Sequence, residues 1–227
     1  EQLKEDVAQM SRHDVKSPLA GVVGILQGLQ KDDLLNTRQV AQLRMAEGAA
    51  MQAINMINLS SELFNIETGN FKLQAKPVDI EALLRNVVEL ARESFASKHI
   101  TIALDSDMPM DEKFPNAFAD SLLCYSVFNN LIKNACEAAP EKSRVTVYLK
   151  SEDPLEIGIG NKGVIPVEIR EHFFERYVTQ GKKNGTGIGT YSAKLLVEAQ
   201  NGTIDFSVLD DEHSTMLRVT LPCAPKA

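Results

Sequence analysis

The stretch GKKNGTGIGTYSAKLLVEAQNG, residues 181–202, guides the interpretation of the rest of the sequence. Three glycines stand at alternate positions directly before an apolar helical pattern that ends at Asn201-Gly202. Because glycine has no Cβ atom, the backbone N–H groups of such a loop can approach a ligand closely. The helix behind the loop adds free N–H groups and the positive end of its dipole, which favour an anion such as a phosphate chain. An ordinary glycine-rich surface loop is the alternative, because the spacing matches neither the P-loop nor the dinucleotide-binding fingerprint.

A second polar feature lies on the helix that the sequence predicts over residues 120–139. Asn130 and Asn134 are four positions apart, so their amides share one helical face, which Lys133 and Glu137 flank. Amides on an otherwise apolar helix need polar partners. A hydrated Mg²⁺ ion with phosphate oxygens would provide them. Solvent-facing asparagines are the alternative.

A third feature is the segment GNKGVIP, residues 160–166, between a predicted strand and a short predicted helix. Its glycines predict a tight turn. Asn161 would present hydrogen-bonding groups there to the edge of a base. A plain strand-to-helix turn is the alternative interpretation.

Apolar residues recur at steps of three and four over residues 3–29 and 40–63, which predicts two long helices joined by a short turn. A lone hairpin cannot enclose both of its apolar stripes. We therefore expect a homodimer, in which two hairpins form a four-helix bundle. The alternative is that the hairpin packs against the rest of its own chain.

The remainder of the chain alternates between strand and helix patterns, which predicts helices on one face of a mixed sheet. The expected fold class is α+β, with an N-terminal helical hairpin followed by an α/β sandwich. The expected domains are residues 1–68 and 69–227. The helices are predicted over residues 78–97 and 120–139 and behind the glycine loop, and the strands over residues 100–104, 145–149, 155–159, 203–208 and 215–221.

Taken in order, these features resemble the ATP-binding domain of sensor histidine kinases, whose fold is shared by DNA gyrase and the mismatch-repair ATPases. The resemblance rests on the asparagine-bearing helix, the N-x-G-x-I-P turn, the Phe173-Phe174 pair and the G-T-G-I-G loop. The predicted hairpin adds SRHDVKSP, residues 11–18, which looks like the phospho-acceptor motif of the same kinases. The resemblance therefore covers the whole chain.

The resemblance implies that His13 accepts the γ-phosphoryl group, which then passes to an aspartate of a response-regulator receiver domain. An imidazole suits this role because its neutral form has a lone pair near physiological pH. By the same resemblance, Asp14 holds the other ring nitrogen. Ser17, one turn beyond His13, stands where bifunctional members orient water to dephosphorylate the regulator, so phosphatase activity is a further expectation.

In the second domain, the resemblance implies ATP and Mg²⁺ as cofactors, with Asn134 as the metal ligand and Asn130 as an amide near the phosphates. Gyrase-type ATPases carry a catalytic glutamate where Asn130 stands. An amide is a poor base, which favours transfer to histidine over net hydrolysis. The expected triphosphate-lining residues are Gly185, Thr186, Gly187, Ile188 and Gly189, and the expected cationic groups are Lys133, Lys182 and Lys183.

The sequence departs from the family pattern at the position that reads adenine, which normally holds an aspartate before Asn-Gly-x-Gly. Here the position is either Asn161, followed by Gly163 with one residue fewer before Ile165, or Gly160. An asparagine can accept from the adenine amino group, but without charge assistance. A degenerate kinase that acts as a dimeric scaffold is therefore one alternative, and an ATPase of the gyrase type is another. Thr190 replaces a usual leucine without an obvious consequence.

Composition restricts the remaining classes. The net charge of −7 argues against nucleic-acid binding. Three cysteines without metal-ligand spacing favour a reducing compartment. No stretch is apolar enough to span a bilayer and no signal peptide is visible, so we expect a cytoplasmic fragment without direct membrane contact. The chain begins at Glu1 inside a predicted helix, which favours a piece of a longer protein, and the sequence leaves membrane anchoring of that protein open.

Overall fold

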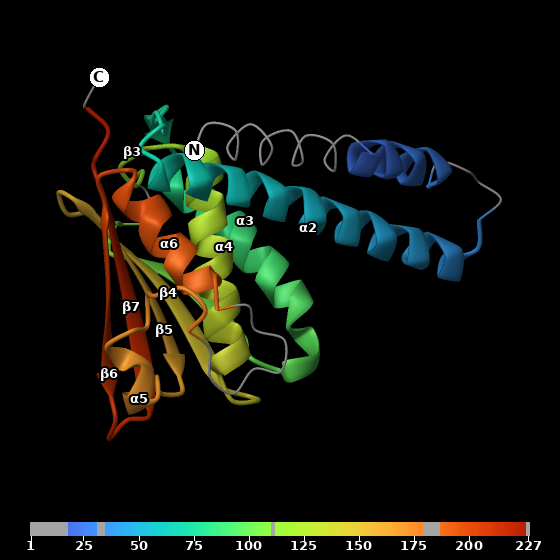
Figure 1. Cartoon of the computed structure of the whole chain (residues 1–227). Coiled ribbons are helices and arrows are strands. Elements are labelled where there is room, and N and C mark those ends of the chain that lie inside the picture. The colour runs from blue at the N-terminus through green and yellow to red at the C-terminus, as the bar shows by residue number, and fades with distance from the viewer. Residues whose placement is uncertain (1–17, 31–34, 110–111, 179–186, 226–227) are drawn as a thin grey trace. The chain divides into compact units, whose positions relative to one another are not determined.

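The computed structural model describes residues 18–30, 35–109, 112–178 and 187–225 (Figure 1). The chain divides into two compact units, Glu1–Phe71 and Lys72–Ala227. Within the described ranges, every helix is too short or too polar to cross a membrane.

The first unit contains a helix over residues 18–29 and the 31-residue helix α2, Thr37–Glu67. A reciprocal cap begins α2. The Asn36 side chain accepts a hydrogen bond from the Gln39 backbone at 2.9 Å, and the Gln39 side chain accepts one from the Asn36 backbone at 3.0 Å. Both bonds satisfy backbone donors that the first turn of a helix cannot pair internally.

Two glutamines connect the first helix to α2. Gln27 Nε2 and Gln30 Nε2 each donate to one oxygen of the Glu47 carboxylate at 2.7 Å. These two hydrogen bonds hold the pKa of Glu47 below its ordinary value, and the bond from Gln27 has the larger effect. The two helices of this unit are therefore joined by a specific polar contact.

The second unit is built on a five-stranded sheet with the strand order β2-β4-β5-β7-β6. Strands β2 and β4 are parallel and the other pairs are antiparallel, so the sheet is mixed, as predicted. A separate antiparallel pair joins β1, Lys76–Val78, to β3, Ala117–Ala119. The strands of the sheet are β2 Thr101–Ser106, β4 Arg144–Lys150, β5 Leu155–Lys162, β6 Thr203–Leu209 and β7 Ser214–Leu221.

Helices α3, α4 and α6 cover one face of this sheet (Figure 1). The helix predicted over residues 78–97 begins at Ile80, because the Asp79 side chain caps it by accepting from the Ala82 backbone at 3.0 Å. It ends at Ser94, and a short 3₁₀ helix follows. The helices are α3 Ile80–Ser94, the 3₁₀ helix Ala96–Lys98, α4 Ser121–Ala138, α5 Val167–Arg170 and α6 Gly189–Glu198.

The buried face of the sheet follows from the strict alternation of burial along β4 and β7. Val147, Ile159 and Leu217 are opposite one another on β4, β5 and β7, and all three are buried. Neighbours two positions away repeat the pattern, so apolar rows run across the sheet beneath the helices. The next row toward the carboxyl end of β5 contains Asn161, a polar residue at a buried, core-facing position.

The opposite face of β5 carries two glycines whose side-chain space is taken by neighbouring strands. A Cβ atom at Gly158 would lie 1.9 Å from Tyr148 Cε1, and one at Gly160 would lie 2.7 Å from Met216 Cε. Tyr148 and Met216 thus lie flat over the strand on the side away from the helices. This arrangement fixes which residues of β5 can face α4.

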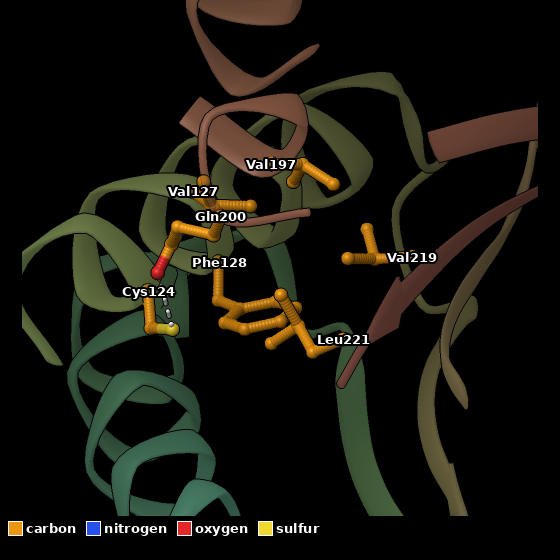
Figure 2. A pocket seen from close by; sticks show the side chains of 7 residues that line it. All are labelled: Cys124, Val127, Phe128, Val197, Gln200, Val219 and Leu221. Atoms are coloured by element: carbon orange, nitrogen blue, oxygen red, sulfur yellow. Dashed lines mark hydrogen bonds between the residues drawn. The ribbon is translucent and has the colours of Figure 1, made fainter. Parts of the chain in front are cut away.

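Gln200 joins the end of α6 to the beginning of α4. Its Oε1 accepts from the Asp120 backbone at 2.9 Å and from Cys124 Sγ at 3.5 Å, and its Nε2 donates to the Leu196 carbonyl at 2.8 Å. Only 1% of Gln200 is exposed. Burial raises the pKa of the Cys124 thiol to about 12. Figure 2 shows the surrounding side chains, Cys124, Val127, Phe128, Val197, Val219 and Leu221.

The space among these side chains is too small for a water molecule, so the cluster around Gln200 is a structural junction and not a ligand pocket. Its amide is satisfied by backbone groups of two helices. Burying a polar group without such partners is costly, so both helix ends depend on this one side chain.

Replacing Gln200 with methionine, which has a similar shape, should lower the free energy of unfolding of the second unit by about 1 to 3 kcal/mol. The substitution leaves the Asp120 N–H without its acceptor. Denaturant unfolding followed by tyrosine fluorescence measures this unit selectively, because all four tyrosines lie in it and the chain has no tryptophan. The exposed change Glu198→Gln on the same helix should stay within about 0.5 kcal/mol. Equal midpoints for both variants would show that the amide is dispensable.

Candidate functional site

The first residue of α6, Gly189, lies beside the asparagine face of α4. A Cβ atom at Gly189 would stand 3.5 Å from Asn134 Nδ2. Asn130, one turn earlier on the same face of α4, is half-buried like Asn134, whereas Lys133 is exposed. The structure therefore brings the asparagine face of α4 to the start of α6, although the two are far apart in the sequence.

The first turn of α6 has N–H groups that its N-cap residue, Ile188, does not satisfy, because this side chain makes no capping hydrogen bond. Gly187 precedes it with a left-handed φ of 64°. A Cβ atom there would lie 2.5 Å from the Tyr177 carbonyl carbon. Position 187 thus requires glycine both for its backbone conformation and for the close approach of Tyr177. A helix start of this kind suits an anionic ligand.

At the end of β5, Asn161 points to the helix-covered side and is 7% exposed. Its Nδ2 donates to the Lys162 carbonyl at 2.9 Å, so the amide oxygen is the acceptor that the side chain presents elsewhere. Gly160 faces Met216 on the other side of the sheet. Of the two sequence candidates for reading a base, Asn161 is the one on the same face as α4.

The turn after Asn161 passes close to the end of α4. Gly163 has a φ of 120°, and a Cβ atom there would lie 3.1 Å from the Ala138 carbonyl oxygen. The turn between β6 and β7 holds it from the other side. Gly163 N donates to the His213 carbonyl at 2.6 Å, and Thr215 Oγ1 donates to the Gly163 carbonyl at 2.8 Å. The position of this turn is therefore determined by hydrogen bonds to a hairpin 50 residues further along the chain.

Arg170 on α5 extends the same connection. Its Nε donates to the Ile165 carbonyl at 2.8 Å, and Nη1 donates to Asp210 Oδ2 at 2.9 Å. The guanidinium group lowers the pKa of Asp210 through these hydrogen bonds. Sequence reasoning missed Arg170, because its carboxylate partner Asp210 lies on a turn that the sequence shows only as an acidic segment.

The aromatic pair that contributes to the family resemblance, Phe173 and Phe174, packs on the sheet. Phe173 lies 5.0 Å from the Phe206 ring on β6 and 5.1 Å from the Phe174 ring, measured between centroids. His172, which precedes them, is exposed, and its Nδ1 lies 2.7 Å from Glu175 Oε1. The hydrogen bond to Glu175 raises the pKa of His172 above its ordinary value.

The structure thus brings part of the predicted site together, and the rest of that site lies outside the described residues. Asn134 meets Gly189, and Asn161 meets Gly163 at the end of α4. Gly187 and Ile188 lie at the start of α6. The predicted residues outside the described ranges are His13, Asp14, Ser17, Lys182, Lys183, Gly185 and Thr186.

The second unit thus combines a mixed sheet covered on one face by helices with a helix that begins at glycines beside the asparagine face of α4. Residues 119–225 match the family described as histidine kinase-, DNA gyrase B-, and HSP90-like ATPase. The chain is 30% identical to the sensory histidine kinase/phosphatase NtrB of Rhodobacter capsulatus over 97% of its own length. It spans 62% of the length of that relative.

Solved structures agree with this assignment. The fold matches full-length ShkA, solved in complex with AMPPNP, with a TM-score of 0.70 over 98% of this chain and 46% of that chain, at 23% identity. It also matches the mycobacterial sensor histidine kinase MprB with a TM-score of 0.57 and 25% identity, over 67% of this chain and 99% of that chain. The likeness to ShkA concerns the fold alone. Together, these findings show that residues 119–225 match the ATPase family and that the chain is similar to sensor histidine kinases over most of its own length.

His172 should titrate above its ordinary pKa, because the carboxylate of Glu175 favours the imidazolium form. A pKa that is raised on folding stabilises the folded state below the unfolded pKa of about 6.5, and this stabilisation disappears as the pH rises through the folded pKa. NMR titration of the ring, assigned with His172→Gln, measures the shift. Glu175→Gln should lower the midpoint more than Glu171→Gln, which removes only a weaker charge effect. Equal midpoints in Glu175→Gln and the parent protein would contradict the assignment.

Proposed function

We propose that this chain is the catalytic core of an ATP-dependent protein histidine autokinase. In this proposal, residues 69–227 bind ATP with Mg²⁺, and residues 1–68 form the dimerising hairpin that carries the acceptor His13. The observation that supports it most directly is the meeting of Asn134 with the start of α6 at Gly189. One ligand placed there would touch both the asparagine face and the N–H groups of the helix.

The phosphate end of the site suits a triphosphate with its metal ion. The first turn of α6 offers N–H donors beside a position without a Cβ atom. Mg²⁺ takes oxygen ligands and typically binds through one or two protein groups together with substrate phosphates and waters. The amide oxygen of Asn134 is a ligand of that kind. When bound, the ion would neutralise charge on the phosphates, and the protein would contribute position and fixed dipoles.

The amide at Asn130 bears on the reaction type. A general base must accept a proton from water, and an amide does so poorly. The site therefore favours transfer of the phosphoryl group to a protein acceptor over hydrolysis. A gyrase-type ATPase is the rival on this point, and it predicts phosphate release that survives the loss of His13.

The base end of the site suits an amino-bearing purine. Asn161 lies on the face of β5 that α4 covers, and its Nδ2 donates to the Lys162 carbonyl, which leaves its amide oxygen as an acceptor. That oxygen would accept from the amino group of adenine with a neutral hydrogen bond, which is weaker than the charge-assisted bond an aspartate makes. We therefore propose adenine recognition by Asn161, with an affinity below that of members that carry the carboxylate.

The acceptor half of the proposal rests on the resemblance, because His13, Asp14 and Ser17 lie outside the described residues. His13 would attack the γ-phosphorus, and Asp14 would hold its second ring nitrogen. The phosphoryl group would then pass to an aspartate of a receiver domain in the cytoplasm. The relative from R. capsulatus is named a kinase/phosphatase. We propose the phosphatase activity for this chain as well, with Ser17 as the residue that orients water.

Incubation with γ-labelled ATP and Mg²⁺ should place an acid-labile, base-stable label on the protein, and His13→Gln should abolish it. Asn134→Ala should reduce the labelling rate by about 10- to 100-fold, because it removes a contact to a charged group. The matched control is Asn129→Ala, which alters an exposed asparagine on another side of α4 and should leave the rate within about twofold.

The rivals give different results in the same experiment. Label on His13→Gln would reject His13 as the acceptor, and phosphate release by that variant would favour the ATPase. A folded dimer that binds no nucleotide at millimolar ATP and Mg²⁺ would favour the scaffold without turnover.

A homodimer is supported by apolar residues on the surface of the first unit. Val22, Ile25 and Leu29 are 45%, 65% and 47% exposed and recur at three- and four-residue steps, so they form a stripe on one side of the helix. Met45 on α2 is 76% exposed. A second copy of the hairpin would cover this stripe, as a four-helix bundle requires.

Ile25→Glu should convert the dimer into a monomer, because it places a charge in the apolar stripe. Sedimentation equilibrium measures the mass, and circular dichroism checks that the helices persist. The exposed change Arg38→Glu at the start of α2 should leave the dimer intact. A parent protein that sediments as a monomer at all concentrations would instead favour packing of the hairpin against its own chain.

A further inference from the structure

Thr190, in the first turn of α6, makes a hydrogen bond that its position in the sequence does not suggest. Its Oγ1 donates to the backbone carbonyl of Phe173 at 3.0 Å, and both residues are half-buried. The hydroxyl thus points out of its own helix to a segment 17 residues earlier. A leucine at this position could not donate to that carbonyl.

The segment that receives this bond is residues 173–177, which we call the phenylalanine strip. Three more contacts join the strip to α6 and its approach. Tyr177 N donates to the Gly187 carbonyl at 2.9 Å. The Arg176 guanidinium lies 4.7 Å from the centre of the Tyr191 ring, and Lys194 Nζ lies 5.8 Å from that of Phe174. The strip therefore follows the first two turns of α6 from one side.

The strip is itself attached to the sheet. Both Phe173 and Phe174 pack against Phe206 on β6, with ring centroids 5.0 and 5.9 Å away. The carbonyl that Thr190 contacts therefore belongs to a residue held by aromatic packing. A hydrogen bond to a fixed partner restrains the helix start more than a bond to a mobile loop would.

The position of this helix start decides the geometry of the phosphate end. Gly189, next to Thr190, lies against Asn134, and the first turn of α6 begins there without a side-chain cap from Ile188. A small displacement of the first turn would change the distance between its N–H donors and the asparagine face. Groups that bind a charged ligand lose affinity when their spacing is not held before binding.

We propose that Thr190 is a positioning residue for the polyphosphate end of the nucleotide, an inference that rests on the proposed ATP-binding function. Its hydroxyl connects the first turn of α6 to the phenylalanine strip, and through Phe206 to the sheet. It touches neither the nucleotide nor the reacting atoms. Threonine has a lower helix propensity than leucine, and the hydrogen bond to Phe173 offsets this disadvantage.

Calorimetric titration with ATP-Mg²⁺ and, separately, with adenosine tests the proposal on the full chain. Thr190→Val removes the hydroxyl and keeps the shape, so it should weaken ATP binding by about fivefold, which corresponds to one net hydrogen bond. Adenosine binding should stay within about twofold, because the base end is held by other residues. Thr190→Ser retains the donor and should restore the ATP affinity of the parent protein.

The matched control is Thr220→Val, near the carboxyl end of β7. This hydroxyl accepts from the Thr203 backbone at 3.0 Å and bonds Thr203 Oγ1 at 2.7 Å, away from the site. Its removal should lower the midpoint of unfolding without changing the ratio of ATP to adenosine affinity. Hydrogen exchange of the Tyr177 amide supplies a ligand-free measurement, and it should be faster in Thr190→Val while sheet amides are unchanged.

The possible results separate the inference from the function on which it rests. Absence of ATP binding by the folded parent protein overturns both. ATP binding by the parent protein with an unchanged affinity ratio in Thr190→Val overturns the positioning role alone. An equal loss of ATP and adenosine affinity also overturns it, because it shows only a general loss of structure. If Thr190→Val does not fold, Thr190→Ala and the exchange of the Tyr177 amide decide by the same criteria.

Discussion

The site depends on the close approach of the phenylalanine strip to the start of α6, at a position where the backbone has no side chain. A Cβ atom at Gly187 would lie 2.5 Å from the Tyr177 carbonyl carbon, and the residue has a left-handed backbone. Gly187 therefore brings the start of α6 and the phenylalanine strip together, and a larger residue there would separate them. At the next glycine, Gly189, a Cβ atom would make only an ordinary van der Waals contact with the Asn134 amide, at 3.5 Å.

The two ends of the site are fixed by different parts of the fold. At the proposed base end, the β6–β7 turn holds the Gly163 turn through His213 and Thr215, and Arg170 extends the connection to Asp210. At the proposed phosphate end, the contacts run from Thr190 to the phenylalanine strip and the aromatic cluster on β6. Strands β6 and β7 therefore support both ends. A ligand that spans the site would have its two halves positioned by a single hairpin.

Sequence reasoning identified the polar features of the site but assigned no role to several of the groups that hold them. Thr190 shows no consequence in the sequence, because its hydrogen-bond partner is 17 residues away on a segment of irregular backbone. Arg170 reads as one charge among several on a short helix, and its role depends on a turn 40 residues later. Gln200 looks like the polar end of an amphipathic helix, although it is buried and satisfied at both ends. Local patterns do not specify such partners.

The sequence by itself predicted the similarity to sensor histidine kinases, because the residues proposed to bind phosphate and metal occur in short contiguous motifs in a recognisable order. It also determined the mixed sheet and its helices, since hydrophobic periodicity reports burial directly. The tertiary structure decided which side of β5 faces the helices, and so placed Asn161, and not Gly160, on the same face as α4. Successive residues of a strand point to opposite faces. Only the register with Tyr148 and Met216 shows which of those faces is covered.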